Sequence, residues 1–278
     1  MNTRQHSVDA ARLRGEFVTP AGPYAALDVV ASTGSTNADL RAAVADGIAD
    51  RTVLLAEEQT AGVGRRGRNW QSPARLGLYC SVLLRPDNVP FARLGSLAVV
   101  AGLAVVDTLD TLGVPVRLKW PNDVLAGENH RKCAGVLSEA APAEENAVVL
   151  GIGVNVLTSR ERVAAGPGGL APTSLAAEGA STTDRTEIAA LLLAALDRRE
   201  RRWRDADGNL AAAGLLDDYR EWCATIGSQV RVIMPDSRVI TGRAADVEDA
   251  GQLVLDVNGD RRTVFAGDVV HLRLDEGE

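Results

Sequence analysis

The stretch EEQTAGVGRRGRNWQSP, Glu57 to Pro73, carries glycines with the G-x-G-x-x-G spacing of a dinucleotide-binding turn. Such a turn follows a strand, opens a helix and needs an acidic residue near the end of the next strand. The preceding segment RTVLLAEE is typical of a buried strand, but RNWQSPARLG is rich in turn residues and GLYCSVLLRP again alternates like a strand. The sequence therefore predicts a strand, a loop and a second strand, which disfavours a Rossmann site.

The loop within this stretch holds Arg65, Arg66 and Arg68 among its glycines. Glycine lets backbone N–H groups come close to a ligand and lets the loop change conformation. Guanidinium groups on such a loop suit a bound anion better than a hydride carrier. We therefore interpret it as an anion-binding loop.

The composition indicates a globular protein whose basic character is local. The chain has 278 residues, 46% of them apolar, and a formal net charge of −7. This balance argues against generic binding to nucleic acid or anionic membranes, for which a basic excess supplies the attraction. The N-terminus lacks the apolar core of a signal peptide, and the longest apolar run, LAVVAGLAVV, is far shorter than the roughly 20 residues of a membrane span. We expect a cytoplasmic protein with neither DNA nor membrane as a partner.

Cysteine and histidine are few and scattered. The three cysteines, Cys80, Cys133 and Cys223, are odd in number and lack metal-ligand spacing, so we expect reduced, packed thiols and no metal ligands. The three histidines are equally dispersed. A catalytic triad or a zinc site therefore has little support.

Lysine usage is unusual. Of the 30 basic residues only two are lysines, Lys119 in RLKWPND and Lys132 in RKCAGVLSEA. Lysine is a compact point charge that fits a crowded centre where the wider guanidinium does not. The two positions are therefore candidates for chemistry, with chance retention as the alternative.

The chain divides by pattern into three parts. Residues 1–26 form a short N-terminal lead, and residues 27–224 mix helix and strand patterns. Residues 225–278 carry about five short strands separated by Pro-Asp, Glu-Asp-Ala-Gly and Asn-Gly-Asp turns. The predicted fold is an α+β domain with a mixed sheet, followed by a small all-β barrel.

Helices and strands of the middle part follow from caps and periodicity. One helix is predicted to begin at Ser35 or Thr36 and to close at Gly47. FARLGSLAVVAGLAVVDTLDTLG reads as a long buried helix ended by Gly113, and a third helix opens with a capping pair at Asp184 and Glu187. KCAGVLSEA and NAVVLGIGVNVL are predicted to be neighbouring strands, followed by the loop AAGPGGLAPTS.

Five short motifs in a fixed order carry a family resemblance. They are GSTN at 34–37, GVGRRGRNW at 62–70, KWPND at 119–123, KCAGVLSE at 132–139 and GIGVN at 151–155. Each motif alone is weak, but together they closely resemble the biotin protein ligase family, from about Ala31 through the C-terminal barrel. The resemblance implies a class II synthetase-like catalytic domain with an SH3-like C-terminal barrel, in the monofunctional form without an N-terminal DNA-binding domain.

The resemblance also implies a reaction. ATP activates the biotin carboxylate to biotinyl-5'-AMP with release of pyrophosphate, and biotin is then transferred to one lysine of a biotin carboxyl carrier protein domain of an acyl-CoA carboxylase. A carboxylate that attacks a phosphate brings two anions together, so the site needs fixed positive charge and Mg²⁺. By resemblance, Lys132 reaches the biotin carboxyl and the bridging phosphate, Arg65 holds the adenylate, and Asp123 positions the carrier lysine. Lys119 completes the catalytic set.

The same resemblance divides the binding residues by ligand. Hydroxyl and amide groups suit the ureido ring of biotin, and small residues suit its apolar tail. The biotin set is Ser35, Thr36, Asn37, Gln59, Gly62, Val63, Gly64, Arg65, Lys132, Gly135 and Gly153, with Val136 beside it. The ATP and adenylate set is Arg65, Arg66, Arg68, Trp70, Lys119, Asn122 and Asn155.

The sequence departs from the family pattern in two places. Val63 stands where the family commonly has arginine, which removes one loop contact. The segment GENHRKCAGVL is longer than the usual tight turn and places Cys133 after the lysine. The conformation of that hairpin is left open.

Three other functions compete with the ligase. A lipoate ligase of related fold would not call for the Ser, Thr, Asn and Gln set, because lipoate has no ureido ring. A biotin-responsive repressor would need a winged-helix domain of some 60 residues before the core, where this chain shows only the lead. A module that binds biotinyl-adenylate without transferring it is disfavoured by the two lysines and Asp123. We expect a monomer or a weak homodimer.

Overall fold

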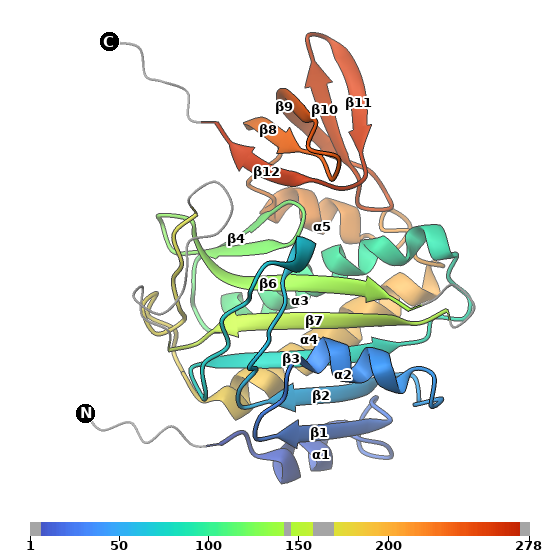
Figure 1. Cartoon of the computed structure of the whole chain (residues 1–278), viewed down its shortest axis with the longest axis vertical. Helices are drawn as coiled ribbons and strands as arrows, with labels where there is room; N and C mark the ends of the chain where they lie inside the picture. Colours follow the sequence, from blue (N-terminus) through green and yellow to red (C-terminus); the bar gives the residue numbers. More distant parts are fainter. Residues whose placement is uncertain (1–6, 142–145, 158–169, 273–278) are drawn as a thin grey trace.

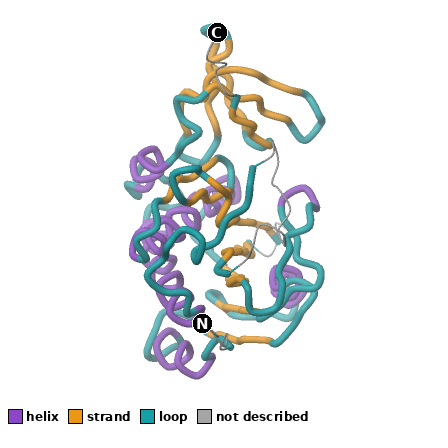
Figure 2. Tube along the Cα trace, turned by 90° about the vertical axis from the view of Figure 1, so that its left-hand side faces the viewer, coloured by secondary structure: helices purple, strands orange, loops and turns teal. Residues whose placement is uncertain are grey.

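The fold is described by a computed structural model, in which residues 7–141, 146–157 and 170–272 are placed well enough to describe. The chain forms a larger α+β part with a small β part at one end of it, which confirms the predicted fold class (Figures 1 and 2). Part of the predicted loop AAGPGGLAPTS lies outside the described residues.

A seven-stranded mixed sheet forms the centre of the larger part. Its order is β1-β2-β3-β7-β6-β5-β4, in which β1 and β2 are parallel and every other neighbouring pair is antiparallel. The predicted neighbours β6 and β7 are paired along most of their length. The strands are β1 Ala26–Val30, β2 Thr52–Ala56, β3 Gly77–Leu84, β4 Val116–Lys119, β5 Asp123–Ala126, β6 Arg131–Ala140 and β7 Val148–Asn155.

Helices cover the two faces unequally. Behind the sheet in Figure 1 lie α3 (Leu97–Thr111) and α4 (Arg185–Asp205), while the short α2 (Thr36–Ala43) crosses the front. The apolar α3 is buried nearly all round, as expected of a helix between a sheet and a second helix. The front face is therefore left open for the motif loops.

The predicted helix ends are largely confirmed. Ser35 caps α2 by accepting from the amide of Ala38 (3.5 Å), and Asp184 caps α4 by accepting from the amide of Thr186 (2.8 Å). The predicted long helix differs at its start, because Phe91–Ser96 is the 3₁₀ segment η2 and the α-helix begins at Leu97. Tight 3₁₀ turns are frequent at helix N-termini.

The segment Phe91–Thr111 is long and apolar enough to be considered as a membrane span. By length and composition alone this segment could cross a membrane, yet 72% of its apolar window is buried inside the fold. Such burial is the pattern of a core helix.

The C-terminal part is an antiparallel five-stranded sheet in the order β11-β10-β9-β8-β12, which confirms the expected small all-β unit. Alternate side chains such as Val230, Val232 and Leu255 form its core. The helix α5 (Leu215–Trp222) leads into it. Its strands are β8 Gln229–Ile233, β9 Val239–Val247, β10 Leu253–Val257, β11 Asp260–Val264 and β12 Asp268–His271.

The described part of the N-terminal lead packs on the larger sheet. Its helix α1 (Ala10–Phe17) contacts β1 and α4, and Leu13 is fully buried there. Tyr24 is also buried and donates its hydroxyl to the carbonyl of Leu193 in α4 (2.8 Å). The lead therefore contributes to the core of the larger part.

This packing predicts the effect of shortening Leu13. Leu13→Ala removes fully buried apolar volume, so we expect the free energy of unfolding to fall by about 2–5 kcal/mol in a urea titration. Arg12→Ala is the matched control, because the Arg12 side chain is half exposed and, within the part of the chain that the structure describes, its ion pair is the i,i+4 pair with Glu16; we expect it to leave the urea midpoint nearly unchanged. Equal effects of the two substitutions would show that α1 does not pack as described.

Candidate active site

Strand register lays two rows of small residues across the front of the sheet. In one row Gly135 of β6 faces Gly153 of β7, with Tyr79 and Asp123 as their partners on β3 and β5. Side chains of one row point to the same face of a sheet. The two glycines therefore leave a shallow floor between Tyr79 and Asp123.

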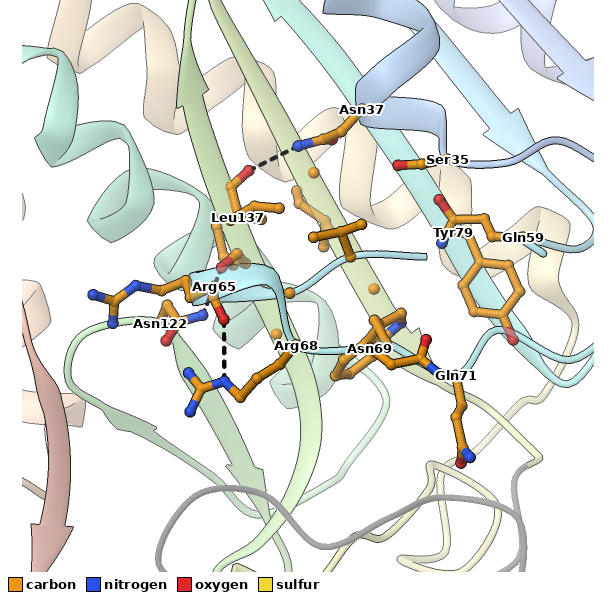
Figure 3. A pocket seen from close by; sticks show the side chains of 18 of the residues that line it. Ser35, Asn37, Gln59, Arg65, Arg68, Asn69, Gln71, Tyr79, Asn122 and Leu137 are labelled. Carbon is orange, nitrogen blue, oxygen red and sulfur yellow. Dashed lines mark hydrogen bonds between the residues drawn. The ribbon is translucent and has the colours of Figure 1, made fainter. Parts of the chain in front are cut away.

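A cavity of about 500 Å³ stands on this floor. Figure 3 shows Asn37, Ser35 and Gln59 toward one end of it and Arg65, Arg68 and Asn122 toward the other. Fifteen predicted site residues line it: Ser35, Thr36, Asn37, Gln59, Val63, Gly64, Arg65, Arg68, Trp70, Asn122, Asp123, Lys132, Gly135, Gly153 and Asn155.

The loop of residues 62–70, which we call the arginine loop, forms the roof of the cavity. It folds back on itself, because the amide of Gly64 donates to the carbonyl of Arg68 (2.7 Å) and the amide of Trp70 donates to that of Gly62 (2.8 Å). The short segment η1 (Arg65–Gly67) forms its tip. Val63, at the position where arginine was expected from the family resemblance, lines the cavity and is 47% exposed.

Trp70 rests on the glycine floor. A Cβ atom at Gly153 would lie 2.6 Å from Trp70 Nε1, and one at Gly135 would lie 3.3 Å from Cζ3 of the same ring. The contact at position 153 requires glycine, and the contact at position 135 is tight enough that an added Cβ would push the ring by a few tenths of an ångström. The buried Nε1 makes no hydrogen bond to any described residue, so a ligand acceptor would satisfy it.

A chain of hydrogen bonds forms the polar end of the cavity. Ser81 donates to Asn37 Oδ1 (2.6 Å) and contacts the hydroxyl of Thr36 (2.7 Å). Thr36 in turn donates to Gln59 Oε1 (3.1 Å), and Asn37 Nδ2 donates to Glu139 (2.8 Å). These contacts fix the orientation of the amide groups, which a ligand with paired donors and acceptors requires.

The second row of the floor makes room for this chain. Gly151 faces Ser81 on one side and Leu137 on the other. A Cβ atom at Gly151 would lie 2.3 Å from Asn37 Oδ1. Glycine at this position therefore allows Asn37 to reach across β7.

The charged end centres on one carboxylate. Lys132 forms an ion pair with Asp123, and Lys119 Nζ lies 3.9 Å from Asp123 Oδ2. The Lys132 ammonium also lies 5.3 Å from the centroid of the Trp70 ring, within range of a cation–π interaction. Burial lowers the pKa of Lys119 although the negative charge of Asp123 opposes the shift. Both lysines of the chain thus meet at Asp123.

Three predicted site residues do not line the cavity. Lys119 is buried and donates to the carbonyl of Val269 (2.6 Å) in β12. Arg66 pairs with Asp268 (3.0 Å), also in β12. A Cβ atom at Gly62 would lie 2.5 Å from the carbonyl oxygen of Trp70, so this glycine shapes the loop from inside.

The predicted nucleotide-side asparagines are held by the backbone. Asn122 Nδ2 donates to the carbonyl of Val136 (2.8 Å), and Asn155 Nδ2 donates to that of Thr173 (3.0 Å). Both residues are thereby fixed at the cavity wall. Their roles toward a nucleotide stay predictions.

Sequence reasoning missed several lining residues, among them Ser81, Tyr79 and Leu137. Ser81 had a detectable signal, because it is a polar residue inside the apolar run GLYCSVLL and is fully buried. A buried hydroxyl needs partners. Its alternation with Tyr79 would have placed both on one face of β3.

Fold and site together define a protein ligase of the biotin and lipoate type. Residues 30–155 match the Biotin/lipoate A/B protein ligase family, and residues 225–272 match the Biotin protein ligase C terminal domain. The chain is 45% identical over 271 residues to the biotin--[acetyl-CoA-carboxylase] ligase of Mycobacterium tuberculosis, with 96% of each chain covered. It belongs to the biotin protein ligase family.

Two further relatives agree. The bifunctional ligase/repressor BirA of Escherichia coli is 31% identical, and the match covers 94% of this chain and 77% of that protein. The solved structure of the biotin protein ligase from Aquifex aeolicus in complex with biotin and ATP has the same fold, with a TM-score of 0.72 and 24% identity. That match covers 90% of this chain and all of the other.

The floor yields a prediction. Gly153→Ala places a methyl group against Trp70, so we expect the indole to move and biotin affinity, measured by calorimetry, to fall by about tenfold or more, ~1.4 kcal/mol. Gly15→Ala is the control, because an added Cβ there meets nothing within 4 Å. Unchanged affinity of Gly153→Ala would show that biotin binding does not depend on this contact.

Proposed function

We propose that the protein attaches biotin to one lysine of a biotin carboxyl carrier protein domain of acetyl-CoA carboxylase, at the expense of ATP and through biotinyl-5'-AMP. The observation that carries the proposal is the cavity itself. Its polar end offers a fixed hydroxyl and amide set, and its other end offers Lys132 and Arg65. The name of the Mycobacterium tuberculosis relative supports the carrier enzyme.

In the first step the biotin carboxylate attacks the α-phosphorus of ATP. A bond forms between a carboxylate oxygen and phosphorus, and the bond to pyrophosphate breaks. Of the cations that line the cavity, Arg68 is bound to Asp268, so Lys132 and Arg65 are the two that would lower the repulsion between the two anions. Asp123 holds the Lys132 ammonium in place through their ion pair.

In the second step the carrier lysine, as a neutral amine, attacks the acyl carbon of biotinyl-5'-AMP. An amide bond forms, AMP leaves with the electron pair, and the amine loses a proton. Asp123 is the carboxylate in the cavity lining, so it is the group that would orient the incoming amine or receive its proton. Its pairing with Lys132 means that both steps share this carboxylate.

Magnesium belongs to the proposal as a companion of ATP. Among the described residues no group of three or more His, Cys, Asp or Glu side chains could hold a metal ion. Mg²⁺ in nucleotide sites needs only one or two carboxylates, because phosphate oxygens and waters complete its shell. Asp123 is already paired with Lys132, so the ion would be held mainly by phosphate oxygens and waters and would neutralise charge on the phosphates.

The cysteines give an indication of the cellular compartment. The free thiols of Cys80, Cys133 and Cys223 are all buried, which suits a reducing compartment such as the cytoplasm. We include this location, and a monomer or weak homodimer, in the proposal. A lipoate ligase is disfavoured because lipoate has no ureido ring to use the hydroxyl and amide groups at the polar end of the cavity.

The transfer reaction gives the direct test. The protein is incubated with biotin, Mg-ATP and a biotin carboxyl carrier domain, and the mass of the carrier is measured by mass spectrometry. We expect one biotin on one carrier lysine, and no addition when lipoate replaces biotin. Addition of lipoate at a comparable rate would contradict the proposed specificity.

Lys132 gives a second prediction. Lys132→Arg keeps the charge but puts a broad guanidinium between Asp123 and Trp70, so we expect most biotin-dependent pyrophosphate release to be lost. Arg131→Lys is the control, because Arg131 pairs with Glu178 (2.6 Å) and does not line the cavity. Release by Lys132→Arg within about threefold of wild type, on the order of 0.7 kcal/mol, would rule out the assigned role.

A further inference from the structure

Three consecutive residues of the C-terminal part contact the active site. The carbonyl of Gly267 accepts from Arg65 Nη1 (3.1 Å), and the carbonyl of Val269 accepts from Lys119 Nζ (2.6 Å). Between them, the carboxylate of Asp268 accepts from Arg66 and Arg68. We call residues 267–269 the anchor segment.

The anchor segment is itself held firmly by the C-terminal sheet. Asp268 pairs with Ile233 at the start of β12, and a Cβ atom at Gly267 would lie 2.6 Å from Val232 Cγ1. Val269 is buried in the core of that sheet. The segment therefore provides a rigid support for what it contacts.

Asp268 is a buried, multiply hydrogen-bonded carboxylate and differs in this from the partner of an exposed surface ion pair. Asp268 is 8% exposed, and it receives three guanidinium hydrogen bonds of 2.9, 3.0 and 3.2 Å. Burial alone would raise the pKa of Asp268, but hydrogen bonds and charges from Arg68 and Arg66 lower it below its ordinary value. The arginines of the loop thus favour the ionised form of this carboxylate.

The arginine loop has two unfavourable features, a strained backbone at Arg66 and closely spaced positive charges. Arg66 has φ of 57°, in the left-handed region that side chains other than glycine avoid. Three guanidinium groups within four residues also repel one another. The buried carboxylate of Asp268 offsets the backbone strain and the repulsion, because it binds two of the three guanidinium groups, those of Arg66 and Arg68.

We propose that Asp268 is a positioning residue that holds the arginine loop closed over the cavity, so that the C-terminal domain sets how long the adenylate is retained. The retention part rests on the proposed function. Arg65 and Trp70 occupy the same loop as Arg66 and Arg68, and both line the cavity. Loss of the Asp268 carboxylate therefore frees the loop, including Arg68 of the cavity lining, without substituting any residue that lines the cavity.

The test compares Asp268→Asn with a matched pair elsewhere on the same domain. Asp246 in β9 accepts two hydrogen bonds of 2.8 Å from Arg220 in α5, so it also joins the C-terminal sheet to the larger part, but it does not line the cavity. Asp246→Asn therefore reports the effect of merely loosening the two parts. Asp268→Glu tests whether restoring the charge restores the function.

Each enzyme is loaded with labelled biotin and Mg-ATP, and release of biotinyl-adenylate is followed after dilution, together with labelling of serum albumin. We expect Asp268→Asn to release it about tenfold faster or more, which corresponds to ~1.4 kcal/mol. Asp268→Glu should recover most of the retention, and Asp246→Asn should release it at the wild-type rate. Wild-type release by Asp268→Asn, or equally fast release by Asp246→Asn, would overturn the proposal.

A second readout does not depend on activity. Trypsin cleaves after arginine, so the unliganded protein should be cut at Arg65, Arg66 or Arg68 faster in Asp268→Asn and unchanged in Asp246→Asn. If wild type forms no adenylate, the proposed function fails and the trypsin result alone decides whether Asp268 holds the loop. If Asp268→Asn does not fold, the double variant Arg66→Gln, Arg68→Gln removes all three hydrogen bonds from the loop side, and trypsin cleavage after Arg65 at the wild-type rate in that variant would equally overturn the proposal.

Discussion

One buried carboxylate, Asp123, holds the charged end of the active site together. The chain has only two lysines, and both approach Asp123. Two ammonium groups so close in a partly buried site would repel each other without a carboxylate between them. Lys132 is thereby placed at the cavity beneath Trp70, while Lys119 is directed to β12. Asp123 therefore links three parts of the structure: its own strand in the floor, the loop with Trp70 through Lys132, and the C-terminal domain through Lys119.

The remaining geometry follows from sheet register. Glycines 135, 151 and 153 fall on neighbouring positions of β6 and β7, so the front of the sheet is hollow where large side chains would otherwise stand. Trp70 uses one part of that hollow and Asn37 uses another. Backbone pairing therefore prepares a polar end and a charged end at a fixed distance. A ligand that carries a ureido ring and a carboxylate at its two ends matches this arrangement.

Local patterns predicted much of this structure, because caps, turns and periodicity act over a few residues. Ser35, Asp184 and the five C-terminal strands were found in this way. The order of five motifs pointed to the cavity, since each motif supplies lining residues. Asp268 could not be predicted, because its partners Arg66 and Arg68 lie about 200 residues away and only the packing of two domains joins them. The place of Lys119 could not be predicted for the same reason, because its ammonium donates to a carbonyl of the other domain, and its catalytic role stays a prediction.

The most direct test of the role of Asp123 is a rapid-quench measurement of biotinyl-adenylate formation by Asp123→Asn, compared with transfer from added biotinyl-adenylate to the carrier. Asparagine keeps the shape but leaves the two ammonium groups without a countercharge. We expect adenylate formation to fall by about 100-fold, on the order of 2.7 kcal/mol, because Lys132 is no longer held. Adenylate formation at the wild-type rate, with only transfer impaired, would contradict a role in organising Lys132 and would confine Asp123 to the carrier lysine.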